Sequence, residues 1–355
     1  MIEHGGNIYK FARILHREPS QILDFSANIN PLGFPQGLKE YLYHSLDSII
    51  CYPDPDYVEL KRLIAEYINL SPENILVGNG AIELISLSIQ TIGKDAIIPI
   101  PTFSEYARIC KVNKLNVEYF PMGKGFKLDI EVLIDRLRTK RHGMLILCNP
   151  NNPTGGFIDI TPLRFLLEET AKLDIFVLLD EAFVEFTEDY PKDSGVNLVK
   201  HYPNLCVIRC FTKFFGLPGM RLGYGVAGKE FIDRLKERAL PWSVNTLADL
   251  AGRYVLKDVE FMEKTREFIK SQRRFLLEEL SSIEWIHPYP SQANFILAKI
   301  DIDSSVLENY LLKKGILIRN CGNFEGLDRS HIRLAVKDHN SNKRLIDELK
   351  SFSNI

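Results

Sequence analysis

The chain has 355 residues, of which 45% are hydrophobic, and its 44 basic and 46 acidic residues leave a formal net charge of -2. This length suffices for one large domain and a smaller one, each with its own core. A nearly neutral chain gives no electrostatic reason to expect a nucleic acid or an anionic membrane as partner. No apolar run approaches the ~20 residues that span a bilayer, and no signal peptide is recognisable, so we expect a cytoplasmic protein. The six cysteines form no Cys-x-x-Cys pair, which predicts buried reduced thiols and no metal site.

Helical and strand patterns alternate along most of the chain. The elements predicted up to residue 210 are helix 8–15, a turn-rich stretch 28–33, helix 57–67, strand 75–80, helix 81–90, and strands 96–100, 143–148, 176–180 and 206–210. Continuous apolar strands separated by helices indicate a mainly parallel sheet covered on both faces. A long helix over 259–280 and strands at 295–298, 316–319 and 331–336 then predict a smaller α+β unit.

These patterns predict an α/β protein in three parts. We expect an N-terminal arm (1–45) that packs with the small domain, a large domain (46–255) and a small C-terminal domain (256–355). Ligands of such a sheet bind beyond the carboxyl ends of its strands. The residues expected there are Gly80, Ala81, Asn152, Asp180, Thr212 and Lys213.

The segment 211–221 carries the clearest chemical signal. Lys213 stands among phenylalanines, and apolar surroundings lower the pKa of a lysine and so favour its nucleophilic amine. Thr212 and Arg221 offer a hydroxyl and a guanidinium that suit a phosphate dianion. A lysine that binds a phosphorylated aldehyde is what pyridoxal phosphate requires. A lysine and an arginine on a surface loop is the plainer alternative.

Two other strand ends fit the same cofactor. Gly80 and Ala81 form a glycine-rich turn at a helix N-terminus, where free N–H groups and the helix dipole attract a phosphate. Asp180 ends an apolar strand, where a carboxylate can pair with a protonated pyridine nitrogen. The plainer alternatives are an ordinary turn and a helix-capping aspartate.

Three further side chains are candidates for contact with the cofactor ring. Asn152 precedes a proline in a turn, where its amide can donate a hydrogen bond to the phenolic oxygen of the ring. Phe103 and Tyr106 follow a strand and can stack on the pyridine face, although a core aromatic is the commoner explanation for either.

Taken in order, these motifs resemble the fold-type I pyridoxal-phosphate enzymes of aminotransferase class I and II. The motifs are Asn-Gly-Ala (79–81), Asn-Pro-Asn-Asn-Pro-Thr-Gly (149–155), Asp-Glu-Ala-Phe (180–183), Thr-Lys-Phe-Phe-Gly-Leu-Pro-Gly-Met-Arg-Leu-Gly (212–223) and a late Arg333. The similarity runs over nearly the whole chain and is closest to the histidinol-phosphate aminotransferase branch. It implies a large domain with a mainly parallel seven-stranded sheet, and a homodimer.

The resemblance also implies a role for individual residues. Lys213 is the catalytic lysine that holds the cofactor as a Schiff base. The other implied cofactor contacts are Gly80, Ala81, Thr212 and Arg221 at the phosphate, Asp180 at the ring nitrogen, Asn152 at the phenolic oxygen, and Tyr52 from the partner subunit. Phe183 stands where aminotransferases of this branch usually carry tyrosine, which puts simple transamination in doubt.

Finer features are similar to the threonine-phosphate decarboxylases of cobalamin biosynthesis. They lie at 4–7, 24–33, 52–57, 240–245 and 316–321. A decarboxylase must hold the bond to the carboxylate perpendicular to the cofactor ring, and a side-chain phosphate is a second anionic handle that can fix this rotation. The candidate substrate contacts are His4, Gly5, Gly6, Asn28, Asn152, Arg319 and Arg333.

The sequence therefore predicts pyridoxal-phosphate-dependent decarboxylation of L-threonine O-3-phosphate, a small phosphorylated amino acid, to (R)-1-amino-2-propanol O-2-phosphate. The first alternative is a histidinol-phosphate aminotransferase that uses 2-oxoglutarate. The second is a non-catalytic binding module on the same fold, against which the retained Lys213 and Asp180 argue. Phosphothreonine and phosphoserine are not separated, since one methyl group changes binding by only ~1–3 kcal/mol.

Overall fold

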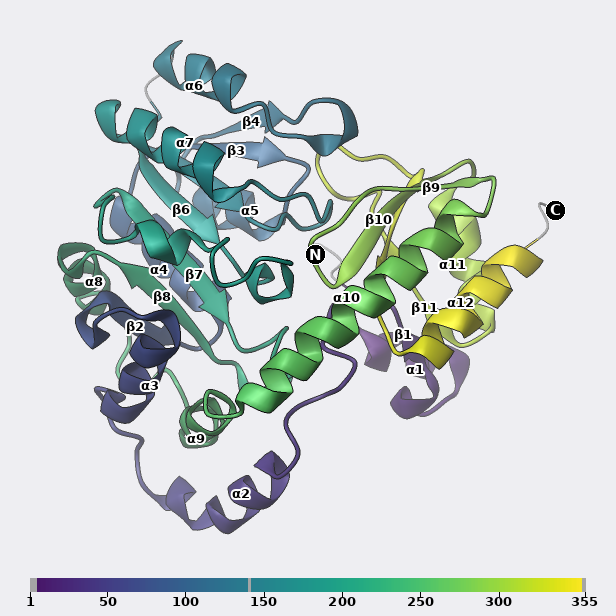
Figure 1. Ribbon diagram of the computed structural model, residues 1–355, viewed down its shortest axis with the longest axis horizontal. Helices are drawn as coiled ribbons and strands as arrows, with labels where there is room; N and C mark the ends of the chain where they lie inside the picture. Colours follow the sequence, from purple (N-terminus) through teal and green to yellow (C-terminus); the bar gives the residue numbers. More distant parts are fainter. Residues whose placement is uncertain (1–4, 140–141, 353–355) are drawn as a thin grey trace.

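The computed structural model describes residues 5–139 and 142–352, and its centre is a seven-stranded sheet (Figure 1). The strand order is β2-β8-β7-β6-β5-β3-β4. The bounds are β2 (Ile75–Gly78), β3 (Ala96–Ile100), β4 (Val117–Pro121), β5 (Met144–Cys148), β6 (Phe176–Asp180), β7 (Leu205–Cys210) and β8 (Gly223–Ala227). Within this sheet, β8 runs in the opposite direction to the other six strands. The expected mainly parallel sheet is therefore confirmed.

Helices cover both faces of this sheet, which explains why its strands read as continuous apolar runs. Successive strand residues face opposite sides: Leu178 packs with the helices α4 and α5, whereas Val177 and Leu179 belong to the core shared with α6 and α7. The helices of this part are α3 (Val58–Ile68), α4 (Ala81–Ile92), α5 (Glu105–Val112), α6 (Ile130–Thr139), α7 (Ile160–Lys172), α8 (Lys229–Lys236) and α9 (Thr246–Val255).

The last hundred residues form a second, smaller layer beside the sheet (Figure 1). A four-stranded antiparallel sheet has the order β12-β13-β10-β9, with β9 (Ile286–Pro288), β10 (Phe295–Ile300), β12 (Arg319–Asn320) and β13 (His331–Ala335). The long helix α10 (Val259–Ser281) reaches it from the large sheet, and α11 (Ser304–Lys313) and α12 (His339–Ser351) pack around it.

The N-terminal segment lies against this smaller layer, although it is at the other end of the sequence. It contains α1 (Ile8–Leu15) and β1 (Leu23–Asp24), whereas the following helix α2 (Leu38–His44) packs against α9 instead. Strand β1 pairs in parallel with β11 (Ile316–Leu317). Two segments almost three hundred residues apart thus form one small sheet.

The prediction of a single strand over 316–319 is wrong. The chain changes partners at the buried Ile318: β11 pairs with β1, whereas β12 pairs with β13 in another sheet. The apolar run has one hydropathy pattern, and pattern alone cannot reveal a change of pairing partner. This break places Arg319 directly across from Arg333 in the register.

Among the helices of the described residues, none is long and apolar enough to cross a membrane.

Candidate active site

A cavity of about 280 Å³ lies at the carboxyl ends of β5, β6 and β7. The end of each strand contributes a side chain to it, and the N-terminal segment and the small C-terminal sheet close it from the other side. Thirteen predicted residues line it: Gly5, Asn28, Ala81, Phe103, Tyr106, Asn152, Asp180, Phe183, Thr212, Lys213, Arg221, Arg319 and Arg333. The fold therefore brings together groups that are spread over more than three hundred residues of sequence.

Three of the predicted residues that the structure describes do not line the cavity. Gly80 immediately precedes the lining residue Ala81, and Gly6 is held by a hydrogen bond from its N–H to Ser26 Oγ at 2.7 Å. Tyr52 is 79% exposed and stacks on Trp242 with 4.7 Å between ring centroids, outside the cavity of its own chain. His4 lies outside the described residues.

Lys213 is half-buried in the loop after β7, and its Nζ lies 5.8 Å from the centroid of the Phe183 ring. Burial lowers the pKa of this lysine, and the positive charges of Arg333 and Arg221 act in the same direction. The neutral, nucleophilic amine is therefore populated at lower pH than in a free lysine. This environment suits covalent attachment of an aldehyde.

The N-terminal segment fixes the backbone around Lys213. Asn30 donates its backbone N–H to Lys213 O at 3.1 Å and its side-chain amide to Phe214 O at 2.8 Å. Gly216 has a φ of +66°, and a Cβ there would lie 2.2 Å from Gly33 O, so only glycine fits this close approach. Sequence reasoning missed Asn30, although it stands in the turn-rich stretch noted at 28–33.

Asp180 is buried and accepts two hydrogen bonds. Tyr106 Oη donates to Asp180 Oδ2 at 2.6 Å, and Ala182 N donates to Oδ1 at 2.9 Å. Burial raises the pKa of this carboxyl group, whereas both hydrogen bonds lower it. Because the hydroxyl of Tyr106 is held by Asp180, we expect Phe103, whose ring meets that of Tyr106 edge-on at 5.5 Å, to be the ring that stacks on a ligand.

Gly80, Arg221 and the start of α4 form a cradle of hydrogen-bond donors. Gly80 has a φ of +78°, and a Cβ there would lie 2.6 Å from Arg221 Nη2. Helix α4 begins after Gly80 with no side-chain cap, so its first N–H groups remain available to an anion. Such a donor set fits the phosphate of pyridoxal phosphate, just as Lys213 fits its aldehyde and Asp180 its ring nitrogen.

Arg333 connects the small sheet to the loop that carries Asn152. Its Nη1 donates to Asn152 Oδ1 and its Nη2 to Ser26 O at 2.8 Å. The oxygen of Asn152 is thereby occupied, which leaves its NH2 group as a donor toward a ring oxygen. Burial, reinforced by Arg319, lowers the pKa of Arg333 to about 10.

Two guanidinium groups and one amide line one side of the cavity. Arg319 and Arg333 are cross-strand partners, and both are at least nine-tenths buried. Asn28 is 2% exposed. Arg333 Nε and Asn28 Oδ1 have no hydrogen-bond partner among the described residues. The two guanidinium groups are donors that suit a ligand with two anionic groups, whereas Asn28 Oδ1 is an acceptor and suits a donor such as an amine.

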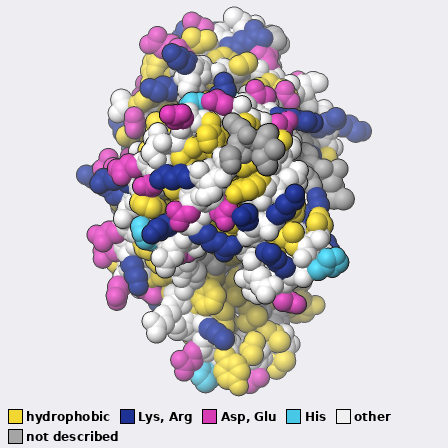
Figure 2. All heavy atoms as spheres, turned by 90° about the vertical axis from the view of Figure 1, so that its right-hand side faces the viewer, with side chains coloured by type: hydrophobic (Ala, Val, Ile, Leu, Met, Phe, Trp, Pro, Cys, Tyr) yellow, Lys and Arg dark blue, Asp and Glu magenta, His cyan; other side chains and the backbone are white. Residues whose placement is uncertain are grey.

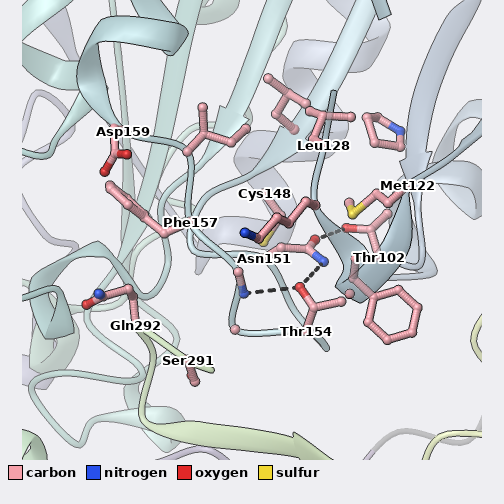
Figure 3. Close-up of a pocket in the computed structure, with 18 of the residues that line it drawn as sticks. Thr102, Met122, Leu128, Cys148, Asn151, Thr154, Phe157, Asp159, Ser291 and Gln292 are labelled. Carbon is pink, nitrogen blue, oxygen red and sulfur yellow. Dashed lines mark hydrogen bonds between the residues drawn. The ribbon is translucent and has the colours of Figure 1, made fainter. Parts of the chain in front are cut away.

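A second cavity, of about 520 Å³, lies on the other side of the loop 149–155 (Figure 3). The polar side chains on its wall bind one another: Thr102 Oγ1 donates to Asn151 Oδ1 at 2.7 Å, and Asn151 Nδ2 donates to Thr154 Oγ1 at 2.9 Å. It is larger than the first cavity, and the charged residues on its lining are Lys127 and Asp159, with no arginine among the described residues that line it. We interpret this network as a brace for the loop that holds Asn152.

A buried ionic cluster supports the sheet beneath the site. Arg209 on β7 lies 3.1 Å from Glu181 Oε2, and donates to Ser194 Oγ at 2.6 Å and to Tyr190 Oη at 3.0 Å. Glu185 lies 3.4 Å away, and burial raises its pKa to about 7. Sequence reasoning missed this cluster, although an arginine inside the apolar strand 206–210 was its signal.

Several lining residues were missed because each is the unremarkable neighbour of a predicted one. They are Ser26, Ala27, Ile82, Ile85, Ser104, Cys148, Ala182, Cys210 and Phe324. The buried-thiol expectation holds for five of the cysteines and is wrong for the exposed Cys51.

The sequence of this chain is similar to a known protein family and to proteins with assigned names. The family model for aminotransferase class I and II matches residues 20–349. A relative from Caldanaerobacter subterraneus subsp. tengcongensis, provisionally named a threonine-phosphate decarboxylase, is 41% identical over 98% of this chain and 93% of its own. The threonine-phosphate decarboxylase of Salmonella typhimurium is 34% identical over 98% of this chain and 96% of its own.

Two solved structures resemble this chain over most of its length. The histidinol-phosphate aminotransferase from Clostridium acetobutylicum has a TM-score of 0.88 and 36% identity, over 93% of this chain and 98% of its own. The L-threonine-O-3-phosphate decarboxylase from Porphyromonas gingivalis has a TM-score of 0.84 and 28% identity, over 93% of this chain and 99% of its own.

Proposed function

The chain belongs to the class I and II aminotransferase family of pyridoxal-phosphate enzymes, and from this premise we propose that it decarboxylates L-threonine O-3-phosphate. The products are CO2 and (R)-1-amino-2-propanol O-2-phosphate, an intermediate for cobalamin biosynthesis. The observation that carries the proposal is the pair Arg319 and Arg333, which face the same cavity as Lys213. The proposal is also supported by the similarity to two proteins named threonine-phosphate decarboxylases.

When bound, pyridoxal phosphate supplies an electron sink for the pair of electrons left at Cα when the carboxylate departs as CO2. Lys213 would provide the amine that attaches the cofactor, and Arg221 with the N-terminus of α4 would bind its phosphate. Asp180 would pair with the ring nitrogen and favour its protonated form, because a carboxylate stabilises an adjacent cation. Tyr106 and Ala182 N hold that carboxylate in position.

The arginine pair orients the substrate. Arg319 binds the phosphate group, and Arg333 with Asn28 binds the carboxylate. Two fixed anionic groups leave little freedom of rotation about Cα, so binding energy from the remote phosphate directs the bond that breaks. The amine of the substrate would take the place of Lys213 on the cofactor, and the freed Lys213, in its protonated form, would return a proton to Cα after CO2 has left.

A histidinol-phosphate aminotransferase is the second candidate, favoured by the similarity to the Clostridium acetobutylicum structure. The test is to incubate the purified holoenzyme with phosphothreonine, phosphoserine, or histidinol phosphate plus 2-oxoglutarate, and to follow CO2 and amine products. We expect CO2 and aminopropanol phosphate from phosphothreonine without any added oxo acid. Glutamate formed from histidinol phosphate, with no CO2 from either phosphoamino acid, would reject the decarboxylase.

We also propose that the chain acts as a homodimer. Apolar side chains gather at the lower end of the molecule around α2 (Figure 2), and those exposed near it are Tyr43, Leu46, Ile49, Ile50 and Tyr52. Such an apolar patch is typical of an interaction surface. Light scattering should give a dimer, and Ile50→Glu should give monomers of reduced activity; a fully active wild-type monomer would contradict this proposal.

A further inference from the structure

Ser26 joins three parts of the chain that meet at the cavity. It lies just after β1 and lines the same cavity as Lys213. Its backbone N–H and its hydroxyl both donate to Asp24 Oδ1, at 2.8 Å and 2.6 Å. Because the hydroxyl proton is directed at Asp24, the hydroxyl oxygen is left as an acceptor for another donor. Every polar atom of Ser26 is hydrogen-bonded, so its position is closely fixed.

The donor to this hydroxyl oxygen comes from residues 5–7, which we name the amino-terminal strap. Gly6 N donates to Ser26 Oγ at 2.7 Å, and Gly5 lines the cavity. A Cβ at Gly5 would lie 2.2 Å from Ser26 O, so the backbone of the strap lies directly against this carbonyl. Helix α1, which packs against β11, follows the strap in the sequence. The strap is therefore anchored by α1 at one end and held by Ser26 along its length.

The carbonyl of Ser26 binds an arginine of the small sheet. Arg333 on β13 donates through Nη2 to Ser26 O at 2.8 Å in a buried hydrogen bond, and through Nη1 to Asn152 Oδ1. Gly5 lies against the same carbonyl and so shields this bond from water. A hydrogen bond is stronger in a buried environment than where it competes with water. Displacement of the strap would therefore also weaken the contact that holds Arg333.

We propose that Ser26 is a positioning residue that holds the amino-terminal strap against the cavity and, through its carbonyl, holds Arg333 against Asn152. For the identity of the ligand, a phosphorylated amino acid, this inference rests on the proposed function. A loose strap leaves the cavity open to water and lowers the affinity for the substrate. The Ser26 carbonyl still binds Arg333 when the hydroxyl is removed, so loss of the hydroxyl should raise KM and change kcat little.

Two measurements on the holoenzyme test the proposal. The first is hydrogen exchange of the peptide that contains Gly6, followed by mass spectrometry, and the second is KM and kcat for CO2 release from phosphothreonine. In Ser26→Ala the amide of Gly6 loses its acceptor and should exchange about tenfold faster. The KM should rise about tenfold, whereas kcat should stay within about twofold of the wild-type value. Melting temperature and cofactor content verify that the variant is folded.

The chain offers a matched control at Ser330. In both places an aspartate two residues earlier accepts hydrogen bonds from the N–H and the hydroxyl of the serine: Asp24 for Ser26, and Asp328 for Ser330. The Ser330 hydroxyl lies 3.3 Å from His331 Nδ1 rather than at the strap, and Ser330 does not line the cavity. Ser330→Ala therefore removes the same local hydrogen bond and should leave both measurements at their wild-type values.

Gly5→Ala is a second, independent variant. Its Cβ would lie 2.2 Å from Ser26 O, so this substitution displaces the strap while the Ser26 hydroxyl remains. It should also give faster exchange at Gly6 and a higher KM. The double variant should be no worse than Gly5→Ala alone, because both substitutions release the same strap. Additive effects on KM would show that the two positions act independently and would overturn the shared role.

The outcomes separate this inference from the proposed function. If the wild-type enzyme releases no CO2 from phosphothreonine, the proposed function is wrong, and the exchange at Gly6 alone decides whether Ser26 holds the strap. If the wild-type enzyme releases CO2 but Ser26→Ala keeps wild-type exchange and KM, the positioning role is overturned and the proposed function stands. A lower kcat at unchanged KM would overturn it as well. Should Ser26→Ala fail to fold, Gly5→Ala decides the question by the same two measurements.

Discussion

Replacing Tyr106 by phenylalanine removes one of the two hydrogen bonds that Asp180 is seen to accept. The Tyr106 hydroxyl lies 2.6 Å from Asp180 Oδ2, and both side chains are buried. Burial raises the pKa of Asp180, and this hydrogen bond opposes that effect by favouring the ionised form. Without the hydroxyl, the carboxyl group becomes protonated at a higher pH than in the wild-type enzyme.

The size of this change follows from the strength of the lost bond. A hydrogen bond to a charged group contributes about 1.5–3 kcal/mol. One pKa unit corresponds to about 1.4 kcal/mol, so the pKa of Asp180 should rise by about one to two units. Because the ring nitrogen of the cofactor pairs only with the ionised carboxylate, the enzyme should lose its cofactor at a correspondingly higher pH.

Equilibrium dialysis of the holoenzyme over a series of acidic pH values measures this loss. The midpoint for release of the cofactor should rise by about one to two pH units in Tyr106→Phe. Tyr57→Phe is the matched control. This substitution also removes a buried hydroxyl, which donates to Val244 O at 2.9 Å, but Tyr57 does not line the cavity. An unchanged or lowered midpoint in Tyr106→Phe would refute the role assigned to this hydrogen bond.

Three more substitutions test other parts of the site. Lys213→Ala should abolish both the absorbance of the attached cofactor and activity; an unchanged spectrum would exclude Lys213 as the anchor. Gly80→Ala should weaken cofactor binding at least about tenfold, because its Cβ would lie 2.6 Å from Arg221 Nη2 at a φ of +78°, and unaltered binding in dialysis would mean that the phosphate lies elsewhere. Arg209→Leu should lower the free energy of unfolding in urea by about 3–5 kcal/mol, since the buried Glu181 carboxylate loses its counter-charge and keeps only its hydrogen bonds from Ser194 and Gly195; a loss below about 1 kcal/mol would contradict this.

Local patterns in the sequence predicted much of the large domain. The strands at 96–100 and 176–180 agree with β3 and β6 to the residue, because a strand buried on both faces is a continuous apolar run with clear ends. The groups at the strand ends, such as Asp180 and Lys213, could be predicted for the same reason: parallel strands end at one edge of the sheet.

Contacts between distant segments could not be predicted in this way. No local pattern shows that the N-terminal strand β1 pairs with β11, or that the chain changes sheets at Ile318. Asn30, which holds the backbone of Lys213, and Asn323, which holds Arg319, are ordinary polar residues in turns until the fold brings their partners to them.

The sequence by itself determined which chemical groups are present: a lysine among aromatic residues, a carboxylate at a strand end, glycines before a helix and late arginines. The presence of these groups follows from the type of each residue and from its near neighbours in the sequence. Only the tertiary structure decided which groups face one another, that Tyr106 binds Asp180 while Tyr52 turns outward, and that two arginines meet across a strand pair. The physical reason is that hydrogen bonding and burial depend on distances in space, which the packing of the whole chain sets.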